Sequence, residues 1–189
     1  MLYEANITKI YTPNVIFAEA ADPGSLTNWT SSGGWTTTTD AYAGSSAIRS
    51  NASIPYPAND SETLQLNSTL DFTNFESVLI QYHAKWDLER SYDYVVIEGS
   101  TDGSNWTELC GKLTKPGAPV ANNTYSSTND AGDSTVKTAS DDAEQNGILS
   151  LYDGDTQDKW NMEEVLIDVS NNSFLHKQGS VFLRFRLNT

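Results

Sequence analysis

The sequence has very few of the residues that build metal and catalytic sites. Its 189 residues include one cysteine, Cys110, and two histidines, His83 and His176. A single cysteine excludes an intrachain disulfide and a thiolate zinc cage. The histidines lie far apart and lack His-Glu-x-x-His spacing, so we expect no zinc peptidase site within this chain. A lone cysteine in a β-rich chain is usually a small buried hydrophobic residue, and we predict that role for Cys110.

Other catalytic motifs are absent as well. The sequence has no Gly-x-Ser-x-Gly element of a serine hydrolase and no glycine-rich phosphate-binding loop. Paired carboxylates can hydrolyse glycosides, but among 25 acidic residues chance pairs are abundant and identify no site. We therefore predict that this chain is not an enzyme.

Positive charge and long apolar segments are scarce. Eleven Lys and Arg residues against 25 Asp and Glu residues give a net charge of −14. Phosphates would be repelled, so nucleic acid and anionic membrane surfaces are not expected partners. No apolar run approaches the ~18–20 residues of a membrane span. The opening stretch MLYEANITKIYTPNVIF does not resemble a signal peptide, and if the protein is exported we expect the chain to be part of a longer one.

Helical periodicity is also missing, whereas Thr, Val, Tyr, Trp and Phe are plentiful. Short strand-like runs separated by turn residues predict strands at 14–20, 35–39, 46–50, 63–70, 78–86, 93–100, 105–110, 164–169 and 180–187. This pattern predicts one all-β domain over 1–189, a two-sheet antiparallel β-sandwich. The segment 117–147 has almost no core-forming residues, and we predict a mobile surface insertion there.

Two of the predicted strands alternate between apolar and polar residues, which indicates one buried face in each. In 78–86 the apolar face comprises Val78, Ile80, Tyr82, Ala84 and Trp86. In 180–187 it comprises Val181, Leu183, Phe185 and Leu187. On the polar faces, we expect Lys85, Arg184 and Arg186 to pair with acids such as Glu98. The Asp102-Gly103 pair lies between two strand-like runs and predicts a hairpin turn.

Two groups of acidic residues are candidate calcium ligands, because carboxylates gathered from loops suit Ca²⁺. The first group is Glu19, Asp22 and Asp40. The second group, in the run YDGDTQDKWNMEE, is Asp153, Asp155 and Asp158. The second run matches an EF-hand loop only in part, because Asp158 stands where that loop needs glycine and a strand-like segment follows. The alternative, which we favour for both groups, is ordinary turn and solvated-loop chemistry.

Four aromatic residues in predicted loops are candidates for a glycan-binding platform, because flat rings stack on the apolar faces of sugars. These residues are Trp29, Trp35, Tyr42 and Tyr56. By contrast, Trp86, Tyr92, Tyr94, Val95, Ile97 and Trp106 are predicted to build the sandwich core and its rim.

The central block AKWDLERSYDYVVIEGSTDGSNWTELCGK resembles a pattern found in C-terminal β-sandwich domains of secreted bacterial zinc carboxypeptidases of flavobacterial type. Those domains are similar to the MAM-like jelly-roll modules of immune inhibitor A metallopeptidases. The later block LYDGDTQDKWNMEEVLIDVSNNSFLHKQGSVFLRFRL and, more loosely, VIFAEAADPGSLTNWTSSGGWTTTTDAYAGSSAIRSN resemble the same family.

The resemblance implies a jelly roll of galactose-binding-like or MAM-like type, outside the cell or on its surface. It implies a non-catalytic accessory domain that positions substrate or stabilises a parent enzyme, with a catalytic domain, a protein substrate or a glycan as partner. Family members continue beyond the R-F-x-L strand, here Arg184 to Leu187, into a last strand whose acids join Glu19 around calcium. The chain stops at Thr189, before that strand. The alternative functions are a carbohydrate-binding module that uses the loop tryptophans and a purely structural docking module.

Overall fold

The computed structural model describes residues 13–20, 25–51, 56–89, 92–114, 145, 148, 150–156 and 158–189. One layer is a five-stranded sheet in the order β1-β4-β9-β6-β7. Its strands are β1 (Trp29–Ser32), β4 (Ser61–Leu66), β9 (Phe182–Asn188), β6 (Tyr94–Ser100) and β7 (Thr107–Glu108). All of its strand pairs are antiparallel.

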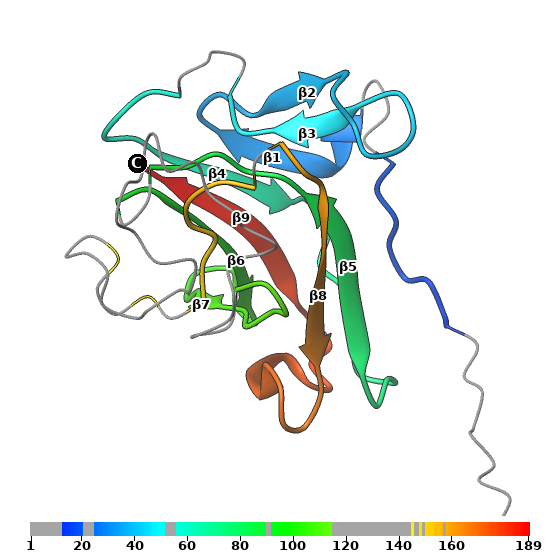
Figure 1. Ribbon diagram of the computed structural model, residues 1–189. Helices are drawn as coiled ribbons and strands as arrows, with labels where there is room; N and C mark the ends of the chain where they lie inside the picture. The colour runs from blue at the N-terminus through cyan, green and yellow to red at the C-terminus, as the bar shows by residue number, and fades with distance from the viewer. Residues whose placement is uncertain are drawn as a thin grey trace, which may run out of the picture.

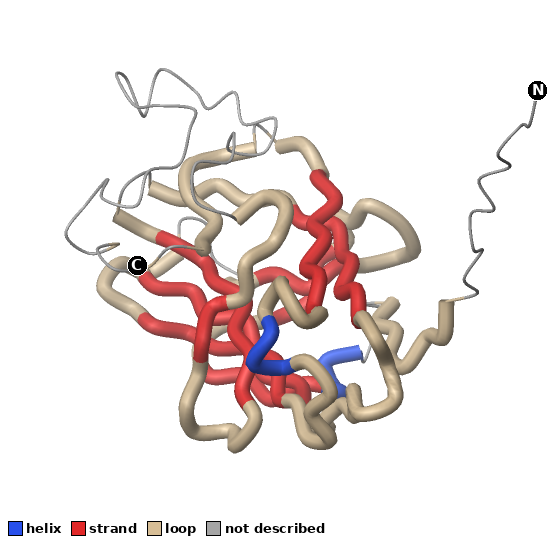
Figure 2. The backbone as a smooth tube through the Cα atoms, turned by 90° about the horizontal axis from the view of Figure 1, so that it is seen from below, coloured by secondary structure: helices blue, strands red, loops and turns tan. Residues whose placement is uncertain are grey.

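The other strands form two antiparallel pairs. They are β2 (Thr36–Thr38) with β3 (Ala47–Arg49), and β5 (Val78–Ala84) with β8 (Asn161–Ile167). The β5–β8 pair lies beside the large sheet, and the β2–β3 hairpin lies near β1 and β4 (Figure 1). Helix in the described residues is limited to two short 3-10 turns, η1 (Ser25–Asn28) and η2 (Ser173–Leu175) (Figure 2). The prediction of an all-β antiparallel sandwich is confirmed.

The apolar faces predicted for 78–86 and 180–187 do face the interior. Val78, Ile80 and Tyr82 of β5 pack against a core that includes Val181 and Leu183. The core residues between the layers are Phe72, Ile97, Leu109, Val165, Ile167, Leu175, Val181 and Leu183. Burial of these side chains, at roughly 1.5–3 kcal/mol for each large one, is the main force holding the two layers together.

The prediction of a strand at 14–20 is wrong, because residues 13–20 form no strand. Val15, Ile16 and Phe17 are exposed. Apolar side chains alone do not form a strand here, because a strand also needs a hydrogen-bonded neighbouring strand. Instead, β1 forms the end of the large sheet by pairing with β4, although its sequence, WTSS, is mostly polar.

No described helix is long and apolar enough to cross a membrane.

The predicted hairpin joins β6 to β7. Gly103 has a φ of +71°, which favours glycine. The Asp102 carboxylate accepts hydrogen bonds from the backbone N–H groups of Ser104 at 2.8 Å and Asn105 at 2.7 Å. These bonds, the Asn105 backbone bond most of all, hold the pKa of Asp102 well below its ordinary value. The hairpin turn predicted at Asp102-Gly103 agrees with this geometry.

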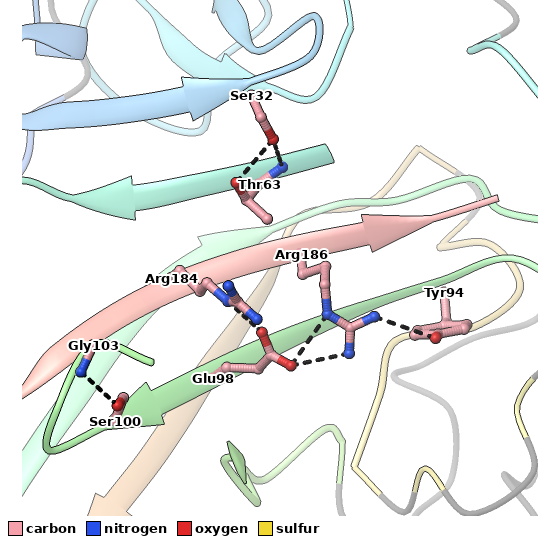
Figure 3. A network of polar contacts seen from close by, with 8 residues as sticks. All are labelled: Ser32, Thr63, Tyr94, Glu98, Ser100, Gly103, Arg184 and Arg186. Atoms are coloured by element: carbon pink, nitrogen blue, oxygen red, sulfur yellow. Dashed lines mark hydrogen bonds and ion pairs between the residues drawn. The ribbon is translucent and has the colours of Figure 1, made fainter. Parts of the chain in front are cut away.

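The pairing predicted for Arg184 and Arg186 is confirmed on the outer face of the large sheet (Figure 3). Arg184 Nε donates to Glu98 Oε2 at 2.5 Å, and Arg186 donates from Nε at 3.1 Å and from Nη2 at 2.9 Å to Glu98 Oε1. Each carboxylate oxygen of Glu98 therefore serves one arginine. The Arg184 guanidinium lies 4.1 Å from the centre of the Trp106 ring, so Trp106 covers this polar face rather than the core.

Two further predictions about side chains are wrong. Cys110 is exposed, because alternation along the chain turns its neighbour Leu109 into the core. Tyr92 is also exposed, in the turn before β6. Lys85 pairs with acids as predicted, but with Asp40 and Asp158 rather than with Glu98, since it follows β5 in the opposite layer from β6. The predicted insertion at 117–147 lies outside the described residues, apart from Gln145, which is buried.

Candidate functional site

Three aromatic side chains meet on the surface. The ring of Tyr42 stacks on the ring of His83, with the centroids 3.6 Å apart and the planes 7° from parallel. Trp160 meets Tyr42 edge-on, at 6.5 Å between centroids and 62° between planes. Tyr42, His83 and Trp160 are called the aromatic cluster below.

The fold brings the cluster together from three separate segments. Tyr42 lies in the connection between β2 and β3, His83 lies in β5, and Trp160 directly precedes β8. Since β5 and β8 pair with His83 opposite Met162, the start of β8 lies next to the end of β5. His83 belongs to the outer face of β5, because Ile80 and Tyr82 face inward.

A charged group borders the aromatic cluster. The Lys85 ammonium forms ion pairs with both Asp40 and Asp158, and it lies 5.5 Å from the centre of the Trp160 ring. Partial burial opposes the charged form of Lys85, but hydrogen bonds to Asp158 and Asp40 outweigh it, so the pKa of Lys85 is raised. Both carboxylates are largely exposed. Their outer oxygens can therefore accept hydrogen bonds from a ligand.

Tyr42 presents the free ring of this arrangement. It is 57% exposed although one ring face is covered by His83, so the opposite face is open to solvent. A flat aromatic face next to carboxylate acceptors and an ammonium donor can bind a molecule that combines an apolar face with hydroxyl groups. Carbohydrates have this chemistry.

The other predicted platform residues lie elsewhere and take part in packing. Trp29 packs against Phe17 and Phe185, and its Nε1 donates to Glu19 Oε2 at 2.9 Å. Trp35 and Tyr56 pack against the cluster of Leu88, Tyr152 and Leu187. The Tyr56 hydroxyl donates to Asp93 Oδ2 at 2.6 Å, and burial, followed by this hydrogen bond, raises the pKa of Tyr56.

The first group of candidate calcium ligands is divided. Glu19 accepts hydrogen bonds from the side chains of Asn28 and Trp29. Asp40 pairs with Lys85 beside the aromatic cluster, and Asp22 lies outside the described residues. A calcium site that includes Asp22 therefore remains a prediction.

The second group is not gathered either. Asp153 is buried and accepts from the backbone N–H of Gly154 at 2.7 Å, whereas Asp158 points outward to Lys85. Asp155 is the β-bridge partner of Asp87, and burial, followed by the charge of Asp155, raises the pKa of Asp87. Within the described part of the chain, no group of three or more His, Cys, Asp or Glu side chains is placed to hold a metal ion.

Sequence reasoning found Tyr42 but missed its partners His83 and Trp160. The sequence marks His83 only as one of two histidines, on the polar face of 78–86, and Trp160 only as part of the acidic run. The usable signal was the outward position of His83 and Lys85 on the alternating segment 78–86, since two outward residues near the end of a strand can meet loops from neighbouring segments.

Comparisons of the chain with protein-family models, with curated proteins and with solved structures found no match.

Proposed function

We propose that this chain is a non-catalytic carbohydrate-binding domain, in which a sugar ring stacks on the open face of Tyr42. The observation that carries the proposal is the exposed Tyr42 ring, fixed from behind by His83 and bordered by the Asp40–Lys85–Asp158 ion pairs. The ring supplies apolar contact and the charged groups supply hydrogen bonds to hydroxyls. This division of roles is typical of small-molecule sites with a few placed polar groups.

Charge favours a sugar over the other ligands that stack on aromatic rings. Nucleic-acid bases also stack on tyrosine and tryptophan, but phosphates would meet a chain of net charge −14 and two exposed carboxylates at the site. A purely apolar ligand would leave those carboxylates without a role. Neutral glycans avoid both problems.

The resemblance to accessory domains of secreted zinc carboxypeptidases supports the wider setting of this proposal. In that setting the domain belongs to an extracellular or cell-surface protein and holds the parent enzyme near a glycan-bearing surface.

A glycan array with purified protein tests the proposal, followed by titration of the ligand bound most strongly. Tyr42→Ala should lower the affinity roughly tenfold or more, since one aromatic stacking contact and its buried area account for about 1.4 kcal/mol or more. Tyr42→Phe should keep most of the affinity. Tyr92→Ala is the matched control, because Tyr92 is also exposed but lies outside the cluster. The proposal is overturned if the protein binds no glycan on the array, or if Tyr42→Ala and wild type bind the ligand with equal affinity.

A further inference from the structure

The outer face of the β5–β8 pair continues from the aromatic cluster. His83 belongs to both, and the same face of β5 carries Gln81 and Leu79. The paired residues of β8 on this face are Met162, Glu164 and Leu166. The six residues Leu79, Gln81, His83, Met162, Glu164 and Leu166 are called the β5–β8 strip below.

Each pair of residues directly opposite one another on the strip is called a level below, and apolar levels alternate with polar ones. Leu79 lies opposite Leu166 at one end, and both are exposed, at 49% and 37%. Gln81 lies opposite Glu164 at the next level, where its Nε2 donates to Glu164 Oε1 at 3.0 Å. His83 lies opposite Met162, which is 40% exposed, and beyond them follow Lys85 and Trp160. Side chains directly opposite on one face are about 5 Å apart, so each level forms a joint surface.

The dimensions of the strip match an extended ligand rather than a single sugar. Successive levels are separated by two residues, or roughly 6.6 Å at about 3.3 Å per residue. From the Leu79 level to Lys85, which follows His83 just outside the strip, this face therefore runs for roughly 20 Å. That length is covered by several pyranose rings in a row, and one ring at Tyr42 would leave most of it empty.

We infer that the ligand is a linear, uncharged oligosaccharide that runs from Tyr42 along the β5–β8 strip; this inference rests on the proposed function. The leucine pair and Met162 contact the C–H faces of successive sugar rings. The Gln81–Glu164 pair exchanges hydrogen bonds with their hydroxyl groups. A chain of alternating apolar faces and hydroxyl edges fits this sequence of levels.

A second copy of the chain fits the same face less well. The centre of a protein interface is depleted in charged residues, whereas Glu164 lies in the middle of the strip and pairs with Lys112 at 3.5 Å. The apolar levels are also only two strands wide. These features favour a narrow, hydroxyl-rich ligand.

A chain-length series tests the inference. The probes are disaccharide, tetrasaccharide and hexasaccharide from whichever linear cello-, xylo-, manno- or chito-oligosaccharide series gives the strongest array signal, with affinity measured by calorimetry. We expect the affinity to rise roughly tenfold from disaccharide to hexasaccharide, as contacts with the two leucines are added. In Leu79→Ser/Leu166→Ser this rise should disappear. Val169→Ser is the matched control, because Val169 is 72% exposed and follows β8 outside the strip.

The outcomes separate the two proposals. Equal affinity for all chain lengths, or an undiminished rise in the double leucine variant, overturns the extended ligand but leaves binding at Tyr42 intact. Failure of every probe to bind overturns the proposed function, and this inference with it. A dimer in light scattering that the double leucine variant converts to monomer assigns the strip to a second copy and also overturns the inference.

Discussion

Replacement of Glu98 by glutamine should destabilise the large sheet strongly. The Glu98 side chain is only 5% exposed and serves two arginines, each of which is 20% exposed. Its two oxygens accept from Arg184 and Arg186 separately. Glutamine offers one oxygen and one NH₂ group, so one guanidinium would face a donor in place of an acceptor.

The magnitude follows from the burial of this group. Removing one partner of a buried ion pair costs about 3–5 kcal/mol, and surface pairs contribute about 0–1 kcal/mol. Since the arginines are partly solvated, we expect Glu98→Gln to lower the free energy of unfolding by about 2–3 kcal/mol, between these limits. A loss of this size is a large share of the ~5–15 kcal/mol that stabilises an ordinary domain.

Urea denaturation followed by tryptophan fluorescence measures this loss as a lower midpoint with an unchanged slope. Glu76→Gln is the control, because Glu76 pairs with Lys177 at the surface and its loss should have little effect. If Glu98→Gln changes stability no more than Glu76→Gln does, the claim that the Arg184–Glu98–Arg186 group holds β6 to β9 is refuted.

Two further predictions concern the core and the β6–β7 turn. In Tyr152→Phe, the buried Glu163 Oε2 loses a hydrogen bond of 2.8 Å and the Tyr82 hydroxyl loses a partner at 2.6 Å. The free energy of unfolding, measured in urea, should therefore fall by about 1–3 kcal/mol. An unchanged urea midpoint would contradict this prediction. The lowered pKa of Asp102 means that its carboxylate stabilises the fold above the unfolded-state pKa of about 3.9 and that this contribution is lost as the pH falls below it. Thermal melts from pH 7 to acid should therefore show wild type losing its advantage over Asp102→Ala, whereas a pH-independent difference would refute this role.

The sequence predicted the strands whose pattern is set by the core. In 78–86 and 180–187, alternation reflects burial of one face, and a local pattern is then enough to give both the strand and its orientation. The Asp102-Gly103 turn was predictable for a similar reason, because the preference of glycine for positive φ is local. Long-range partners decide the other cases: β1 exists through its pairing with β4, while the more apolar segment 14–20 has no strand partner among the described residues.

The candidate site was predictable only in part. Tyr42 could be identified as an aromatic residue in a loop, but nothing near it in sequence indicates that His83 covers one ring face. Lys85 was expected to bind an acid on a neighbouring strand, and it binds Asp40 and Asp158 from loops instead. Those contacts depend on the packing of the β2–β3 connection against the end of β5, which no local pattern encodes.

The position of the site between two small sheets has a consequence for binding. Lys85 ties the β2–β3 connection, through Asp40, to the segment before β8, through Asp158. Together with the His83 stack, these contacts hold Tyr42 in place before a ligand arrives. A fixed ring loses less conformational entropy on binding than a mobile one, and ordering such a side chain costs about 0.5–1.5 kcal/mol. The ion pairs therefore contribute to affinity by orienting Tyr42 as well as by contacting hydroxyl groups, even though surface ion pairs add little to the stability of the fold.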